Sequence, residues 1–250
     1  MADSQPEPEE AKAIKPQGQF ARFANEVSFS DITLHFSGRK FHAHRLMLAA
    51  KSDYFDTMFK SAFQDKNQKE IELHEDDADS LETMLLYIYH DGVTDELEID
   101  DQNHRARALK LLTVADKYQV HALKESIING IAMNLSKGWS KTKVNATIDA
   151  LQTIDPGILA PYYDVVCKHL GDKYFLSIFR LPKFDNLMEA HPQLAVKVTY
   201  LIWQNRKLFN GCGQCSVCDY VWTPQYQIKG WGTIHFCSVC AKKVEFKEWE

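Results

Sequence analysis

The sequence predicts an α+β protein in which a mixed domain of strands and helices precedes a helical region and a small β module. Three observations lead to this fold class. Residues 32–36 alternate apolar and polar side chains, as a half-buried strand does. Residues 81–89 carry apolar side chains at helical spacing. Five of the six cysteines lie near the C-terminus in closely spaced pairs.

The N-terminal segment, residues 1–24, is predicted to be a disordered tail. Its first part is rich in Pro, Glu and Gln and has few large apolar side chains. Such a segment cannot bury enough surface to offset the entropy lost on ordering.

A first strand is expected over 32–36, followed by a turn at 37–40 and a returning strand that begins at Phe41. Ser52 is a suitable N-cap for a helix that carries Tyr54, Phe55, Met58 and Phe59.

Another strand is expected where Ile71 and Leu73 alternate with glutamates. Asp79-x-x-Glu82 resembles a capping box at the start of the next helix. Further apolar periodicity between 108 and 131 predicts more helix.

Residues 136–208 are predicted to form a helical extension. Prolines divide this region into short amphipathic segments, including 144–151, 162–170 and 194–203.

The C-terminal module, residues 209–250, contains Cys212, Cys215, Cys218, Cys237 and Cys240. Two C-x2-C pairs separated by 18 residues have the spacing of a tetrahedral zinc site in a ribbon-like β module. The N-terminus resembles no secretion signal, which favours a reducing compartment and zinc over disulfides or an iron–sulfur centre.

Four of the five cysteines are enough for one zinc ion. Cys-Ser-Val-Cys occurs at 215–218 and again at 237–240, so Cys215, Cys218, Cys237 and Cys240 are the expected ligands. Cys212, which lies between two glycines, is the alternative for one of the first pair. Four thiolates leave no open position for water, so the zinc is expected to be structural.

Composition argues against several classes of function. A net charge of -5 disfavours nucleic acid, and the zinc module itself is close to neutral once four thiolates and the metal are counted. No apolar run is long enough for a membrane span.

The order of motifs in residues 25–135 resembles the BTB (POZ) domain family. The resemblance rests on these segments: Ser30-Asp31-Ile32-Thr33-Leu34, Gly38-x-x-Phe41-x-x-His44-Arg45-x-x-Leu48-Ala49-Ala50-x-Ser52-x-Tyr54-Phe55-x-x-Met58-Phe59, Ile71-x-Leu73, Leu85-x-Tyr87-Ile88-Tyr89 and Leu112-x-x-Ala115-x-Lys117-Tyr118. With the helices and the cysteine pairs that follow, the chain is similar to BTB proteins of filamentous fungi.

The resemblance implies a helical cluster flanked by a small sheet, and a non-enzymatic adaptor that forms homodimers and recruits other proteins. It also implies that Asp31 and Arg45 line a charged pocket near the dimer interface. Many members bind a cullin-3 ubiquitin ligase scaffold through a hydrophobic-x-Glu element, and the matching positions here are Phe63 and Asp65. Asp65 departs from that pattern by one methylene.

The alternative function that the resemblance implies is a transcriptional or chromatin-associated scaffold without direct DNA binding. Either function is expected in the cytoplasm, the nucleus or both. The cargo protein is not identified by the sequence.

Overall fold

The structure, a computed structural model, describes residues 19–61, 68–90, 102–137, 140–170, 175–179 and 181–204, and the backbone of four short strands at 213–214, 221–222, 234–236 and 243–245. The chain divides into two units, residues 1–96 and 97–250, and each is described by itself.

The first unit contains a three-stranded sheet in the order β2-β1-β3. Strand β1 (Ile32–Phe36) pairs antiparallel with β2 (Arg39–Ala43) and parallel with β3 (Glu70–Glu72). Alternate residues of β1 are buried, so the strand predicted over 32–36 is confirmed.

Two residues, Ser37 and Gly38, join β1 to β2. Both have positive φ angles, 46° and 76°, which is the backbone of a type I′ hairpin turn. Strand β2 therefore begins at Arg39, two residues before the start predicted from the sequence.

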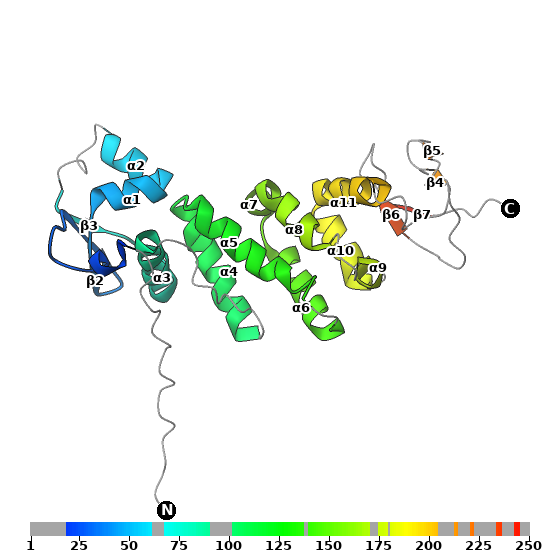
Figure 1. Ribbon diagram of the computed structural model, residues 1–250, viewed down its shortest axis with the longest axis horizontal. Coiled ribbons are helices and arrows are strands. Elements are labelled where there is room, and N and C mark those ends of the chain that lie inside the picture. Colours follow the sequence, from blue (N-terminus) through cyan, green and yellow to red (C-terminus); the bar gives the residue numbers. More distant parts are fainter. Residues whose placement is uncertain are drawn as a thin grey trace, which may run out of the picture. The chain divides into compact units, whose positions relative to one another are not determined.

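Helices cover the sheet of the first unit (Figure 1). They are the α-helices α1 (Arg45–Lys51), α2 (Asp53–Lys60) and α3 (Ala78–Tyr89). The 3-10 helix η1 (Ala21–Phe23) precedes the sheet in the sequence and packs against α3. The Ser52 hydroxyl accepts a hydrogen bond from the Phe55 backbone N–H at 3.2 Å, which confirms Ser52 as the N-cap of α2.

The second unit is mainly helical, as predicted for the region after residue 136. Its helices are α4 (Gln102–Lys117), α5 (His121–Met133), α6 (Lys141–Thr153), α7 (Pro156–Leu159), the 3-10 helix η3 (Ala160–Tyr162), α8 (Tyr163–Leu170), α9 (Phe175–Phe179), α10 (Pro182–Ala190) and α11 (Pro192–Gln204). Prolines occupy the first position of α7, α10 and α11, where a missing N–H costs nothing.

The C-terminal strands form two antiparallel pairs. Strand β4 (Gly213–Gln214) pairs with β5 (Val221–Trp222), and β6 (Ile234–Phe236) pairs with β7 (Lys243–Glu245). Residues 215–220 join the first pair, and residues 237–242 join the second.

The boundary between the two units falls at residues 96 and 97, whereas the sequence predicts domain limits at 24, 135 and 208. Those limits stay predictions. Within the described residues no helix is both long and apolar enough to cross a membrane.

Candidate functional site

Asp31 and Arg45 meet at the start of α1. The Asp31 carboxylate accepts a hydrogen bond from the Arg45 backbone N–H at 2.8 Å. Arg45 is the first residue of α1, and the side chain of its N-cap residue, His44, makes no capping hydrogen bond. Asp31 therefore caps α1 from outside the helix, and its negative charge lies where the helix dipole favours it.

The Arg45 guanidinium contacts other groups. It lies over the Phe59 ring, 4.7 Å from the ring centroid, and donates a hydrogen bond to the backbone oxygen of Gln68. Among the described residues the Asp31 and Arg45 side chains form no ion pair with each other. Arg45 thus connects α1 with the end of α2 and with the segment that leads to β3.

Three apolar side chains are exposed around this junction. The exposed fractions are 83% for Phe29, 79% for Leu46 and 65% for Val27. The hydrogen bond between Asp31 and Arg45 brings the segment of Phe29 next to the helix turn of Leu46. We call Val27, Phe29 and Leu46 the apolar face, because they lie on the two segments that this hydrogen bond joins and are exposed. Exposed apolar surface of this kind marks interaction sites.

The segment that carries Val27 and Phe29 is held in a strained conformation. Phe29 has a φ of 67°, a region that bulky side chains rarely adopt. Asn25, with a φ of 54°, accepts a hydrogen bond from the His42 backbone N–H at 2.9 Å. The Ser30 hydroxyl and backbone N–H both donate to the Val27 oxygen. These contacts fix the turn that exposes Phe29.

Tyr89, at the end of α3, supports the start of α1 from inside the unit. Its hydroxyl accepts a hydrogen bond from the His44 backbone N–H at 2.8 Å and forms a second hydrogen bond, of 3.0 Å, with His44 Nδ1. The ring is buried, and burial raises the pKa of Tyr89 to about 12.

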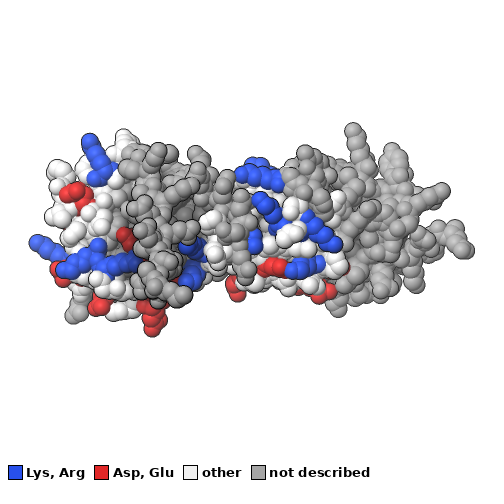
Figure 2. All heavy atoms as spheres, turned by 90° about the horizontal axis from the view of Figure 1, so that it is seen from below, with Lys and Arg blue, Asp and Glu red and all other residues white. Residues whose placement is uncertain are grey.

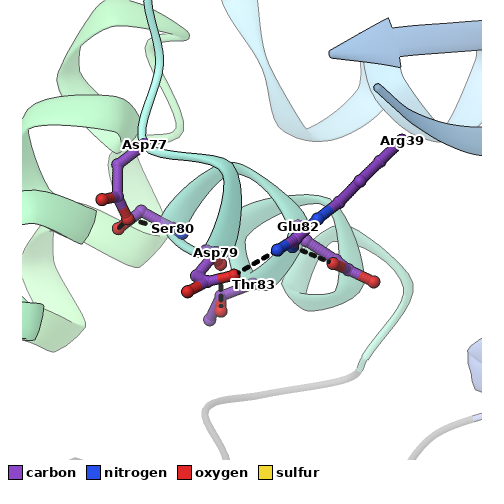
Figure 3. Close-up of polar contacts among 6 residues, drawn as sticks. All are labelled: Arg39, Asp77, Asp79, Ser80, Glu82 and Thr83. Carbon is purple, nitrogen blue, oxygen red and sulfur yellow. Dashed lines mark hydrogen bonds and ion pairs between the residues drawn. The ribbon is translucent and has the colours of Figure 1, made fainter. Parts of the chain in front are cut away.

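Arg39 joins the hairpin to α3 on the surface of the same unit (Figure 3). Its guanidinium donates to the carboxylates of Asp79 and Glu82, each at 2.6 Å. The capping box predicted from Asp79 and Glu82 is therefore wrong. The N-cap of α3 is Asp77, whose side chain accepts hydrogen bonds from the Ser80 N–H at 3.2 Å and the Ser80 hydroxyl at 2.8 Å.

The other predicted site residues lie outside the described residues. These are Phe63 and Asp65, and the five C-terminal cysteines Cys212, Cys215, Cys218, Cys237 and Cys240. In the part that is described, no three His, Cys, Asp or Glu side chains gather as a metal site.

The charge of the chain is unevenly divided. Residues 1–96 contain 10 Lys/Arg and 19 Asp/Glu, a net charge of -9, whereas residues 97–250 contain 19 and 15, a net charge of +4. Figure 2 shows Lys and Arg side chains gathered on the visible face of the second unit, with few acidic side chains among them. The net charge of the whole chain is -5, so it does not reveal that the second unit is basic.

Comparison with protein families identifies the domain that contains the apolar face. The family model described as "BTB/POZ domain" matches residues 20–133. The chain contains a BTB/POZ domain. That domain includes the whole described part of the first unit and extends through α4 and α5 of the second.

Several curated proteins are similar to part of this chain. The ARM repeat protein interacting with ABF2 from Arabidopsis thaliana is 32% identical over 117 residues, 46% of this chain and 15% of that protein. Kelch-like protein 40 from Xenopus tropicalis is 36% identical over 96 residues, which are 38% and 14% of the two chains. BTB/POZ and MATH domain-containing protein 4 from Arabidopsis thaliana is 28% identical over 173 residues, 66% and 35%.

These matches span much less than two thirds of the relatives' own lengths. A solved structure, the BTB domain of zebrafish PATZ1, is 25% identical and covers 40% of this chain and 74% of its own, with a TM-score of 0.32. The apolar face and the Asp31–Arg45 junction lie within residues 20–133, which match the BTB/POZ domain model.

Sequence reasoning missed the apolar face. Val27 and Phe29 are isolated apolar residues in a polar stretch, and their exposure depends on contacts made by Asn25 and Ser30. Leu46 stands in an apolar run, in which the sequence does not distinguish an exposed position from a buried one such as Leu48.

Proposed function

We propose that the protein is a non-enzymatic adaptor that forms homodimers through its BTB/POZ domain and recruits other proteins. BTB/POZ domains mediate protein–protein interactions and dimerisation. The observation that carries the proposal is the apolar face, because Phe29 and Leu46 are more than three quarters exposed in the single chain. Covering them in a dimer removes apolar surface from water.

Leu46→Asp tests the dimer, because it places a charge on the apolar face without altering a buried side chain. We expect dimer dissociation to increase by about thirtyfold or more, since truncating a central apolar contact costs roughly 2 kcal/mol or more. Light scattering over a concentration series measures this. Thr57→Asp, at an exposed position of α2, adds the same charge elsewhere and should leave the dimer intact.

A monomeric wild-type protein at micromolar concentration would remove the homodimer from the proposal. Equal dissociation of the Leu46→Asp and Thr57→Asp proteins would place the dimer contact away from the apolar face. Circular dichroism spectra of both variants establish whether each is folded.

A cullin-3 scaffold is the partner we propose for the adaptor. The support is the sequence position of Phe63 and Asp65. They come shortly after α2, which carries Met58 and Phe59 and ends at Lys60, and the family's scaffold-binding element has the same place in the sequence. Affinity purification with wild type and Phe63→Ala tests it. Recovery of the cullin with wild type alone is the expected result, and its absence from both samples would refute this partner.

The C-terminal module is proposed to bind one structural zinc ion through Cys215, Cys218, Cys237 and Cys240. The strand pairs support this choice of ligands. The two joining segments, 215–220 and 237–242, have equal length, and each begins with Cys-Ser-Val-Cys directly after a paired strand. Cys212 precedes β4 and belongs to neither segment. Two segments of equal length that each supply two thiolates suit a tetrahedral ion.

Cys237→Ser is expected to release zinc and unfold the module, because metal binding supplies folding free energy that so small a core lacks. Cys212→Ser is the matched control and should retain one zinc per chain. Metal analysis of both purified proteins shows which of the two cysteines is a zinc ligand. Zinc loss in the Cys212→Ser protein would instead make Cys212 a ligand.

The second candidate function is a transcriptional or chromatin-associated scaffold without direct DNA binding. The basic charge of the second unit favours it, because such a unit attracts acidic partners. Cytoplasm and nucleus are both proposed as locations, since thiolate zinc ligands need a reducing compartment. Fractionation of cells that express the full chain separates the two.

A further inference from the structure

The ends of two helices meet in the second unit. Ser136, just after α5, and His169, near the end of α8, are joined by a hydrogen bond of 3.0 Å between Ser136 Oγ and His169 Nδ1. The other ring nitrogen, Nε2, lies 2.9 Å from Asn129 Oδ1 on α5. Two contacts therefore fix the end of α8 against the end of α5.

Three lysines lie close to this contact along the chain. Lys137 follows Ser136, Lys168 precedes His169, and Lys141 begins α6, the helix that follows α5 and packs beside it. All three side chains are exposed, and none forms an ion pair with another described residue. We call Lys137, Lys141 and Lys168 the lysine cluster.

Acidic side chains on the same helices do not neutralise the cluster. Asp149 of α6 binds Lys183, and Asp164 of α8 binds Lys197, each at 2.5 Å. The first turn of α6 contains no acidic residue, and Lys141 lies at its positive end. A lysine there opposes the helix dipole, so its position weakens the helix rather than supporting it. Local rules are broken in this way mainly at functional sites.

We propose that the lysine cluster binds an acidic segment of a partner protein, and so forms a cargo-binding surface of the adaptor. The inference rests on the proposed adaptor function and adds the chemistry of the partner. An acidic segment offers the carboxylates that the three lysines lack among the described residues. Attraction between opposite charges speeds encounter and selects such partners.

A nucleic acid fits these observations less well. Its affinity depends on neutralising many phosphates, and the cluster supplies three lysines on a chain of net charge -5. Lysine also lacks the fork geometry with which arginine binds phosphate at two points. A short acidic segment needs neither a long basic track nor such a fork.

The test measures binding of a labelled oligoglutamate peptide to the full-length protein by fluorescence anisotropy. Two variants are compared with wild type. The cluster variant replaces the three lysines of the cluster with glutamine: Lys137→Gln, Lys141→Gln and Lys168→Gln. The control variant removes the same charge from exposed positions of the first unit: Lys40→Gln, Lys51→Gln and Lys69→Gln. Oligothymidylate of equal charge is the second probe.

We expect the cluster variant to bind the peptide about tenfold more weakly than wild type and the control variant to bind as wild type does. Binding should also weaken as ionic strength rises to about 0.15 M. Equal peptide affinity in all three proteins, or no binding by wild type at low salt, would overturn the proposal. Tighter binding of oligothymidylate through the same lysines would overturn it in favour of nucleic acid.

Light scattering on the same samples separates this inference from the proposed function. A cluster variant that still forms dimers but loses the peptide supports both. A wild-type protein that binds the peptide as a monomer would contradict the dimerising adaptor and leave the lysine cluster supported.

Discussion

Replacing Tyr89 with phenylalanine is expected to destabilise the BTB/POZ domain through one hydroxyl group. That hydroxyl accepts a hydrogen bond from the His44 backbone N–H and forms another with His44 Nδ1, and the tyrosine is 1% exposed. Phenylalanine keeps the ring and its packing against Phe41 and His44. The substitution therefore isolates the two hydrogen bonds at the start of α1.

The expected loss in free energy of unfolding is about 2–3 kcal/mol. A buried N–H left without a partner costs about 1–3 kcal/mol, and the second hydrogen bond adds about 1 kcal/mol. With a urea dependence of about 1–3 kcal/mol per molar, the midpoint should fall by about 1–2 M.

Urea unfolding by circular dichroism measures this change in Tyr89→Phe and in Tyr54→Phe, a control at a position where the ring is 36% exposed. All five tryptophans, at positions 139, 203, 222, 231 and 249, lie in the second unit. Tryptophan fluorescence therefore follows that unit separately in the same samples. A midpoint in Tyr89→Phe equal to that of Tyr54→Phe would refute the role of the hydroxyl.

Alkaline pH provides a second test of the same reasoning. The pKa of Tyr89 is about 12 in the folded protein against an ordinary value of 10.0, so between these values the unfolded chain loses the proton first. The raised pKa of Tyr89 therefore stabilises the folded protein below pH 10. This contribution to the free energy of unfolding, about 2–3 kcal/mol in all, is lost as pH rises toward 12. The stability difference between wild type and Tyr89→Phe should narrow over this range. A difference that stays constant from pH 9 to 12 would contradict it.

Two further predictions concern other contacts. Burial lowers the pKa of His191, whose neutral ring binds the Tyr163 hydroxyl and the Leu151 oxygen, so the second unit should lose stability as pH falls below 6.5. His191→Gln should make the stability of the second unit less dependent on pH, as measured by unfolding followed through tryptophan fluorescence. If the stability of the variant falls below pH 6.5 as much as that of wild type, His191 is not the cause. Arg39→Gln should reduce stability slightly at low ionic strength and not at high salt, because its two ion pairs lie at the surface. A loss independent of salt would point to packing instead.

Local patterns predicted much of the fold. Alternation fixed the position of β1, and the single serine before Asp53 identified the cap of α2. The apolar periods of the helical extension were expected at 144–151, 162–170 and 194–203, and the structure has α6, α8 and α11 there. Each of these features depends on residues that are neighbours in the sequence.

Features that depend on distant residues were not predictable in the same way. Asp31 caps a helix that begins 14 residues later, so no local capping pattern reveals it. Asp77 and Asp79 are both suitable caps for α3. Asp77 is the cap in the structure, whereas Asp79 forms an ion pair with Arg39, which is 40 residues away in the sequence. Exposure of the apolar face likewise depends on tertiary contacts.

The parallel pairing of β1 with β3 has a consequence for how the chain folds during synthesis. Strand β3 follows α1 and α2 in the sequence, so the sheet stays open along one edge of β1 until about residue 72 has left the ribosome. Until then the hairpin can form, but the backbone groups along the open edge of β1 lack their final partners. Pairings over such sequence distances form slowly because a long loop must close first. The nascent domain is therefore expected to need chaperone protection over this interval, before any dimer can form.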